Sequence, residues 1–118
     1  MPPRTNPDDV LPLKPKPFLL LLVLAQDGPL HGYAVKQAMQ ERSDGRVSMD
    51  PGGFYRLVSR LERDGLLCRV DRPGDDPDER RQYLDVTDWG RAVVAAEASR
   101  ISTLAQLPSV QALAREAR

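Results

Sequence analysis

The sequence predicts a mainly α-helical fold with one small β-hairpin, and three features of the chain predict it. Gly28-Pro29 and Ser43-Asp44-Gly45 break the first half of the chain into short segments. Residues 51–64 carry apolar side chains at helical spacing. Two runs, at about 66–72 and 80–86, have the pattern of short strands on either side of a loop rich in Pro, Gly and Asp. A chain of 118 residues supports one domain with a modest core.

The first 16 residues are expected to form a flexible, proline-rich arm. Each proline removes a backbone donor and biases the residue before it away from the helical conformation. Such an arm becomes ordered only if it packs on another surface. Six of the eleven prolines of the chain lie in the arm or at its border: Pro2, Pro3, Pro7, Pro12, Pro15 and Pro17.

The first helix is expected from about Pro17 to Gln26. Its run Phe18–Ala25 is apolar on all sides, so we expect protein to surround it. The run is far shorter than the ~20 residues that a membrane span needs. The residues that follow it form a turn and not a signal-peptide cleavage site. We therefore expect a cytoplasmic protein without a membrane partner.

The second helix is expected from Leu30 or His31 to Arg42, and Ser43-Asp44-Gly45 ends it. Tyr33 is expected on the core side, with its hydroxyl at the surface. His31 is expected to cap or brace the turn before the helix. A lone histidine has no set of partners for a metal site or a catalytic triad.

The third helix is the best specified. Asp50 can cap it, Pro51 fits its first position, and Gly65 fits just past its end. Four apolar residues at i, i+3, i+4 and i+7 face the core: Phe54, Leu57, Val58 and Leu61. The other face carries Gly52, Gly53, Tyr55, Arg56, Ser59, Arg60 and Arg63.

A last long helix is expected from the cap Thr87 to about Leu107, with a short helix or frayed end after Pro108-Ser109. Its apolar residues form two adjoining stripes, which is more apolar surface than a lone terminal helix needs. The order helix, helix–turn–helix, hairpin, helix predicts a winged helix-turn-helix over residues 17–86. Residues 87–118 are then a C-terminal dimerisation helix and tail.

Composition excludes several classes of function. Lys+Arg and Asp+Glu both number 17, so any contact with nucleic acid needs local segregation of charge. One cysteine, Cys68, and one histidine leave no disulfide and no metal site. The chain has no Gly-rich phosphate loop and no nucleophile with a base. We therefore expect no enzyme, no catalytic residue and no cofactor.

Five short motifs stand in a distinctive order: GPLHGY at 28–33, PGGFYR at 51–56, LERDGL at 61–66, RRQY at 80–83 and TDWGR at 87–91. Singly each is weak, but together, at these separations, they resemble the PadR family of bacterial transcriptional regulators. The resemblance covers roughly residues 18–107. The length of the chain suggests the short subgroup, which has a single C-terminal helix.

The resemblance implies that residues 51–64 are a recognition helix and that the hairpin is a wing. The two glycines would let the duplex approach, the helix dipole would favour a phosphate there, and the arginines could reach base edges or phosphates. From the residues alone, an ordinary solvated face is an equal interpretation. The loop is acidic, and Gly53 stands where the family commonly has Thr or Ser. The expected DNA-binding residues are Gly52, Gly53, Tyr55, Arg56, Ser59, Arg60, Arg80 and Arg81.

The resemblance also implies a homodimer, usually a repressor, that binds double-stranded DNA, and we expect its operator to be an inverted repeat. The first and last helices would form the interface, through Phe18, Leu21, Leu22, Val94, Ala98, Ile101 and Leu104. Several members respond to small aromatic or cationic compounds, so Trp89 is the candidate contact for a small aromatic effector. The alternative for Trp89 is a packing anchor between wing and last helix. The alternative function is a winged-helix protein–protein interaction module without specific DNA binding.

Overall fold

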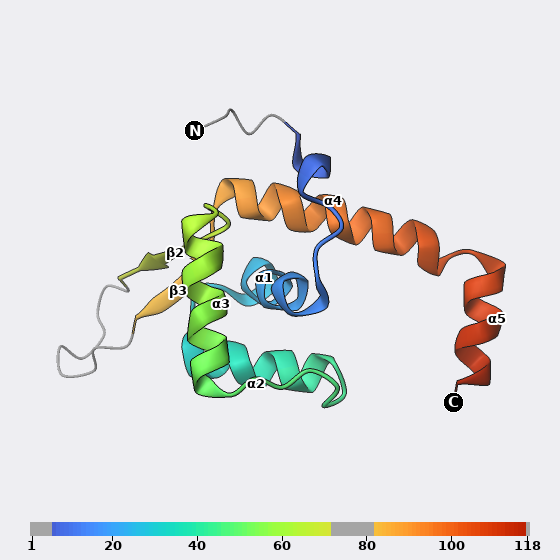
Figure 1. Cartoon of the computed structure of the whole chain (residues 1–118), viewed down its shortest axis with the longest axis horizontal. Coiled ribbons are helices and arrows are strands. Elements are labelled where there is room, and N and C mark those ends of the chain that lie inside the picture. Colours follow the sequence, from blue (N-terminus) through green and yellow to red (C-terminus); the bar gives the residue numbers. More distant parts are fainter. Residues whose placement is uncertain (1–5, 72–81, 118) are drawn as a thin grey trace.

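The computed structural model describes residues 6–71 and 82–117, which form one 3₁₀ helix, five α-helices and a three-stranded antiparallel sheet (Figure 1). The mainly helical prediction and the hairpin are confirmed. The elements are η1 (Pro7–Val10), α1 (Pro15–Asp27), β1 (Leu30–His31), α2 (Gly32–Arg42), α3 (Pro51–Arg63), β2 (Leu67–Val70), β3 (Tyr83–Val86), α4 (Asp88–Ala105) and α5 (Pro108–Glu116).

Helix α1 lies at the centre of the molecule, with α2, α3 and α4 around it (Figure 1). Leu20, Leu21, Val23 and Leu24 are at most 1% exposed. The expectation that protein surrounds this apolar helix is confirmed. The surrounding protein is the chain itself, so most of α1 needs no second copy to cover it.

The sheet has the order β1-β3-β2. Leu67 pairs with Val86 in the predicted hairpin, and Leu30 pairs with Leu84 on the other side of β3. Strand β1 was not expected, because two residues are too short to show an alternating pattern. Its pairing keeps Leu30 and His31 out of the second helix, which begins at Gly32.

The helix ends follow the predicted capping pattern. The Asp50 side chain accepts a hydrogen bond from the Gly53 N–H, and Gly65 lies past the end of α3 with a φ of +75°. His31 Nδ1 accepts a hydrogen bond from the Ala34 N–H at 3.3 Å, which confirms its role as a cap. The expectation for Tyr33 was wrong, since this side chain is 63% exposed. Val35 is buried, and Tyr33, two residues away, projects from the opposite face of the helix.

A close contact joins the start of α4 to the end of α3 and the hairpin. The Thr87 hydroxyl donates to the Gly65 carbonyl at 2.6 Å and accepts from the Gly90 N–H at 2.9 Å. The Thr87 N–H donates to the Leu66 carbonyl at 3.2 Å. A Cβ at Gly90 would lie 1.9 Å from that same carbonyl oxygen, so only glycine fits.

The arm is packed from residue 6 onward, unlike the flexible arm expected for residues 1–16. Its helix η1 lies across α4 (Figure 1), and Leu11 and Leu13 pack against the core. The Leu13 N–H donates to Glu97 Oε2 at 2.5 Å. The condition for order, a surface to pack on, is met by α4.

Glu97 is fully buried, although it is charged. It is paired on both sides, because Arg100 Nε donates to Oε1 while the Leu13 N–H donates to Oε2. The hydrogen bond from Arg100 is the main cause that lowers the pKa of Glu97, against the opposing effect of burial. This pairing offsets the cost of a buried carboxylate.

Helix α4 extends beyond the body of the molecule and leads into α5, which turns away from it (Figure 1). Residues 99–117 are all exposed. Of the two expectations for the end of the chain, a short helix or a frayed end, the short helix is present as α5, which begins at Pro108. The single C-terminal helix that the resemblance suggests is thus followed by a second one. Among the described residues, no helix is long and apolar enough to cross a membrane.

We predict that Gly90→Ala destabilises the fold by about 2–3 kcal/mol, because the added methyl group meets a backbone carbonyl that cannot move aside. Gly52→Ala is the matched control. Its Cβ meets two side-chain atoms, Arg56 Nη1 at 3.2 Å and Asp50 Oδ2 at 3.3 Å, and no backbone atom, so stability should change by less than ~1 kcal/mol. Urea unfolding followed by circular dichroism measures both. Equal midpoints for the two variants would contradict the close contact.

The lowered pKa of Glu97 predicts a stability that depends on pH. A carboxyl whose pKa is lower in the folded state stabilises the fold above its ordinary pKa of 4.5, and this contribution disappears as the pH falls through the folded value. The free energy of unfolding should therefore fall more steeply in the wild type than in Glu97→Gln below about pH 4.5. Glu41→Gln, at an exposed position, should follow the wild type. Parallel curves for wild type and Glu97→Gln would exclude this effect.

Candidate DNA-binding interface

One face of α3 packs against the core, and the opposite face is exposed to solvent. Phe54, Leu57, Val58 and Leu61 are at most 7% exposed, as their spacing predicts. The opposite face presents its polar side chains to solvent. The structure therefore brings together six of the predicted DNA-binding residues: Gly52, Gly53, Tyr55, Arg56, Ser59 and Arg60.

The amino end of α3 is occupied by groups of the chain itself. The Asp50 carboxylate accepts a hydrogen bond from the Gly53 N–H at 3.0 Å, and this hydrogen bond is the main cause that lowers the pKa of Asp50. The Arg56 guanidinium lies over Gly52, with Nη1 3.2 Å from the place of a Cβ on that glycine. The expected phosphate at this end would meet a carboxylate. Contacts with an anion on this face must therefore come from side chains and not from the backbone at the amino end of α3.

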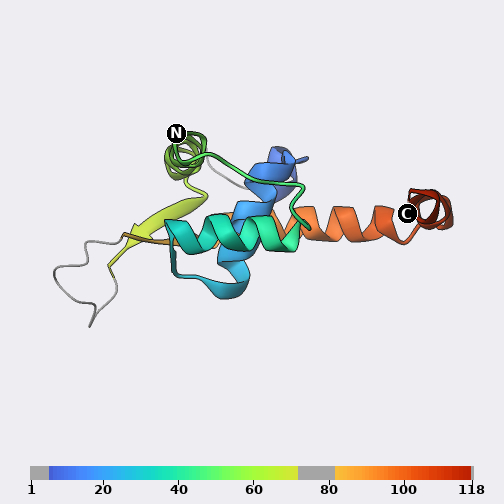
Figure 2. The same cartoon turned by 90° about the horizontal axis from the view of Figure 1, so that it is seen from below.

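A groove of about 980 Å³ runs between α3 and the start of α1. Figure 2 shows α3 and the amino end of α1 on the same side of the molecule. Five basic residues line the groove, and none of the described residues lining it is acidic. Val47, Met49 and Leu57 are among its apolar lining. The basic residues are Lys14, Lys16, Arg56, Arg60 and Arg63.

Basic residues gather along this groove, and a chain without net charge needs such local segregation of charge for contact with nucleic acid. None of the three ion pairs among the described residues involves its five cations. Lys14 and Lys16 were not among the predicted site residues, because some 40 residues separate them from α3. The available signal was small: two of the three lysines of the chain stand together at the start of the first helix.

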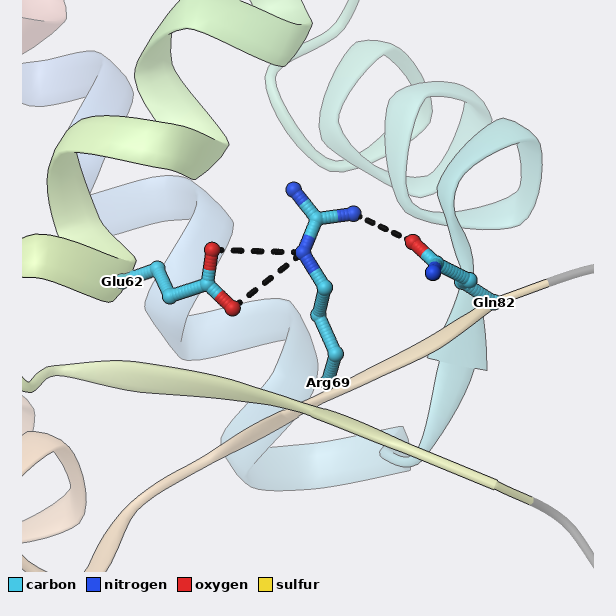
Figure 3. Close-up of polar contacts among 3 residues, drawn as sticks. All are labelled: Glu62, Arg69 and Gln82. Atoms are coloured by element: carbon cyan, nitrogen blue, oxygen red, sulfur yellow. Dashed lines mark hydrogen bonds and ion pairs between the residues drawn. The ribbon is translucent and has the colours of Figure 1, made fainter.

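Arg69, at the base of the hairpin, is held by partners within the chain (Figure 3). Its Nε lies 3.2 Å from both carboxylate oxygens of Glu62 on α3, and its Nη1 donates to Gln82 Oε1 at 2.5 Å. This arginine ties the hairpin to α3. The two expected wing contacts, Arg80 and Arg81, lie outside the described residues.

The structure corrects two of the expected interface residues. Leu21 is 0% exposed and Val94 is 4% exposed, so the core of the single chain already buries them. Phe18, Leu22 and Ala98 are half-buried. The exposed apolar surface lies further along the chain, on the end of α4 and on α5, at Ile101, Leu104, Leu107, Val110 and Leu113. The spacing of Val110 and Leu113 was the signal for α5.

Trp89 is half-buried and packs against the core, as its alternative interpretation expects. Trp89 does not line the groove between α3 and the start of α1. Cys68 is half-buried, and burial raises the pKa of its thiol, with smaller effects from Asp85 and Glu62. A raised pKa makes a poor nucleophile at neutral pH. The described residues contain no cluster of His, Cys, Asp or Glu that could hold a metal ion.

Comparison with known proteins finds a family match over most of the fold. The model of the "Transcriptional regulator PadR-like family" matches residues 20–96. An uncharacterized 37.1 kDa protein in transposon TN4556 of Streptomyces fradiae is 34% identical over 86 residues, which are 73% of this chain. The chain spans about a quarter (23%) of that relative's length.

Two solved structures share the fold. The transcriptional repressor CouR, bound to a 23-mer DNA duplex, is 23% identical with a TM-score of 0.66, over 95% of this chain and 80% of that one. The PcaV transcriptional regulator from Streptomyces coelicolor, in complex with its natural ligand, is 27% identical with a TM-score of 0.62. The latter match covers 88% of this chain and 70% of PcaV.

Proposed function

Because the chain belongs to the PadR-like family of transcriptional regulators, which are not enzymes, we propose that it is a homodimeric, sequence-specific repressor that binds an inverted-repeat operator. The observation that carries this proposal is the exposed face of α3. On this face Arg56 and Arg60 line a groove whose described lining has five basic residues and no acidic residue. The phosphates of a DNA duplex carry the opposite charge along the whole length of this groove.

The side chains of α3 fit two kinds of contact. Arg56 and Arg60 stand one turn apart, so both can enter one major groove, and a guanidinium can pair with the two acceptors of a guanine. The Tyr55 and Ser59 hydroxyls can donate to phosphates. Arg56 must leave its place over Gly52 to do so, and the flexible side chain allows that movement. Arg60 and Arg56 therefore read sequence, and the hydroxyls fix the register.

A second copy would pair with the exposed apolar residues at the end of α4 and on α5. Ile101, Leu104 and Leu113 are 38–64% exposed, although they are apolar. Apolar residues clustered on an exposed surface mark an interface. A two-fold dimer then presents two α3 helices to half-sites about 10 base pairs apart. The duplex bound to CouR supports DNA binding by this fold.

Release by a small molecule is the second part of the proposal, and the ligand bound to PcaV supports it. Trp89 remains our candidate contact for a flat aromatic effector, since it lies at the start of α4, beside the hairpin. An effector weakens DNA binding by its difference in affinity for two arrangements of the dimer.

Titration with planar aromatic compounds, following Trp89 emission and DNA binding together, tests this contact. Release of DNA without a change in emission would place the effector elsewhere.

We predict that Arg56→Ala weakens binding to a duplex chosen by the wild type by about 1–3 kcal/mol and relaxes the preference at one base pair. Arg42→Ala is the control, because Arg42 is exposed on α2 and pairs with Asp27, away from the groove. Fluorescence anisotropy with a set of single-base variants measures both quantities. Unchanged binding by Arg56→Ala would contradict the role of α3. If the wild type binds no DNA but captures a protein partner, the interaction-module alternative replaces the proposal.

We predict that Ile101→Asp with Leu104→Asp gives folded monomers, because the new charges would be buried in the dimer but remain exposed in the single chain. Ala95→Asp, exposed on the other side of α4 from Leu104, should stay dimeric. Sedimentation gives the mass, and circular dichroism checks the helix content. A folded wild-type monomer at micromolar concentration would refute the dimer.

A further inference from the structure

The start of α1 carries a charge feature that the recognition helix does not explain. Lys14 and Lys16 are exposed, and they line the same groove as three arginines of α3. They flank Pro15, and Pro17 follows, so the backbone that carries them has little freedom. The third lysine of the chain, Lys36, lies on α2 and does not line this groove.

The two walls of the groove carry different cations. On α3 the cations are arginines, whose planar fork suits the paired acceptors of a base edge. On α1 they are lysines, whose compact ammonium groups act as point charges and suit phosphate oxygens. With α3 in the major groove, a basic wall on the same side of the protein lies where a backbone strand borders that groove. A continuous polyanion matches five cations spread over two helices better than a small anion does.

The segment before the lysines is fixed to the dimerisation helix. The Leu13 N–H, directly before Lys14, donates to the buried carboxylate of Glu97 at 2.5 Å. The carboxylate keeps its orientation because Arg100 donates to its other oxygen. Pro12, Pro15 and Pro17 have no N–H, so few backbone donors remain in this segment to anchor it. Glu97 therefore sets where the chain enters α1 and where Lys14 stands.

We propose that Lys14 and Lys16 form a phosphate clamp, a second DNA contact that is independent of sequence, and that Glu97 is its positioning residue. The clamp rests on the proposed function, since it needs a duplex on α3. It assigns different tasks to the two walls: α3 reads bases, and the start of α1 holds one strand. It also makes the arm part of the DNA-binding surface, through a carboxylate on α4.

The test measures the salt dependence of binding. Dissociation constants are determined by anisotropy between 50 and 300 mM NaCl, on a duplex selected by the wild type and on an unrelated duplex of equal length. Each phosphate contact contributes a slope of about 0.9 to the plot of log K against log salt. Lys14→Ala and Lys16→Ala should each lower the slope by about that amount, and the double variant by roughly twice as much. Both duplexes should weaken by the same factor, whereas Arg56→Ala changes their ratio.

Arg42→Ala is the control and should keep the wild-type slope, because Arg42 pairs with Asp27 and does not line the groove. A wild-type slope in the Lys14→Ala/Lys16→Ala double variant would overturn the clamp. The proposed function would stand in that case, provided that the wild type still prefers its selected duplex and Arg56→Ala reduces that preference. Absence of DNA binding by the wild type would instead overturn the proposed function. The two failures are therefore distinguishable.

Glu97 is tested by variants that differ in the acceptor they keep. Glu97→Gln retains a carbonyl oxygen for the Leu13 N–H and should keep most of the slope. Glu97→Leu removes the acceptor and should lower the slope toward that of the double lysine variant. Added to that double variant, Glu97→Leu should cause no further loss, because both changes act on one contact. Leu13→Pro, which removes the donor and leaves Glu97 paired with Arg100, serves if Glu97→Leu does not fold. A wild-type slope in every folded variant would overturn the positioning role.

Discussion

Burial of α1 is the constraint on which the rest of the structure depends: Leu20, Leu21, Val23 and Leu24 are fully enclosed, while Phe18 and Leu22 stay half-buried. A helix with apolar residues around its whole circumference cannot lie on a surface, so the other elements must enclose it. Each fully buried Leu or Val contributes about 1.5–3 kcal/mol. Helices α2 and α4 and strand β3 contact α1 directly, and α3 packs its apolar face into the same core. The order of elements along the chain then leaves the polar face of α3 outside.

The same enclosure explains how a chain of zero net charge can present a basic surface. Acidic groups near α3 accept hydrogen bonds from groups of the same chain: Asp50 from the Gly53 N–H, and Glu62 from Arg69. On α4, Glu97 is buried against Leu13 and Arg100. The cations along the groove have no ion pair among the described residues. Net charge therefore says little about this protein's partners, whereas the distribution of charge over its surface says much.

Local signals predicted α3 in full, because its cap, its first proline, its apolar spacing and its terminal glycine all lie within residues 50–65. The same holds for Thr87 as the cap of α4. Tyr33 was assigned to the wrong face of α2, which is a local error, and the other misses are long-range. Strand β1 exists only through its pairing with β3, and Leu21 and Val94 were assigned to a dimer because the sequence does not show how much one chain can cover. The groove could not be predicted either, since the contact that places Lys14 joins residues 13 and 97.

Selection of bound fragments from a random duplex library by the purified protein shows whether α3 reads a symmetric DNA sequence. We expect enrichment of an inverted repeat whose half-sites are about 10 base pairs apart. Selection with Arg56→Ala should yield a motif of the same spacing that has lost its preference at one position in each half-site. Enrichment of no motif by the wild type, or of the same motif by Arg56→Ala, would contradict this role of α3.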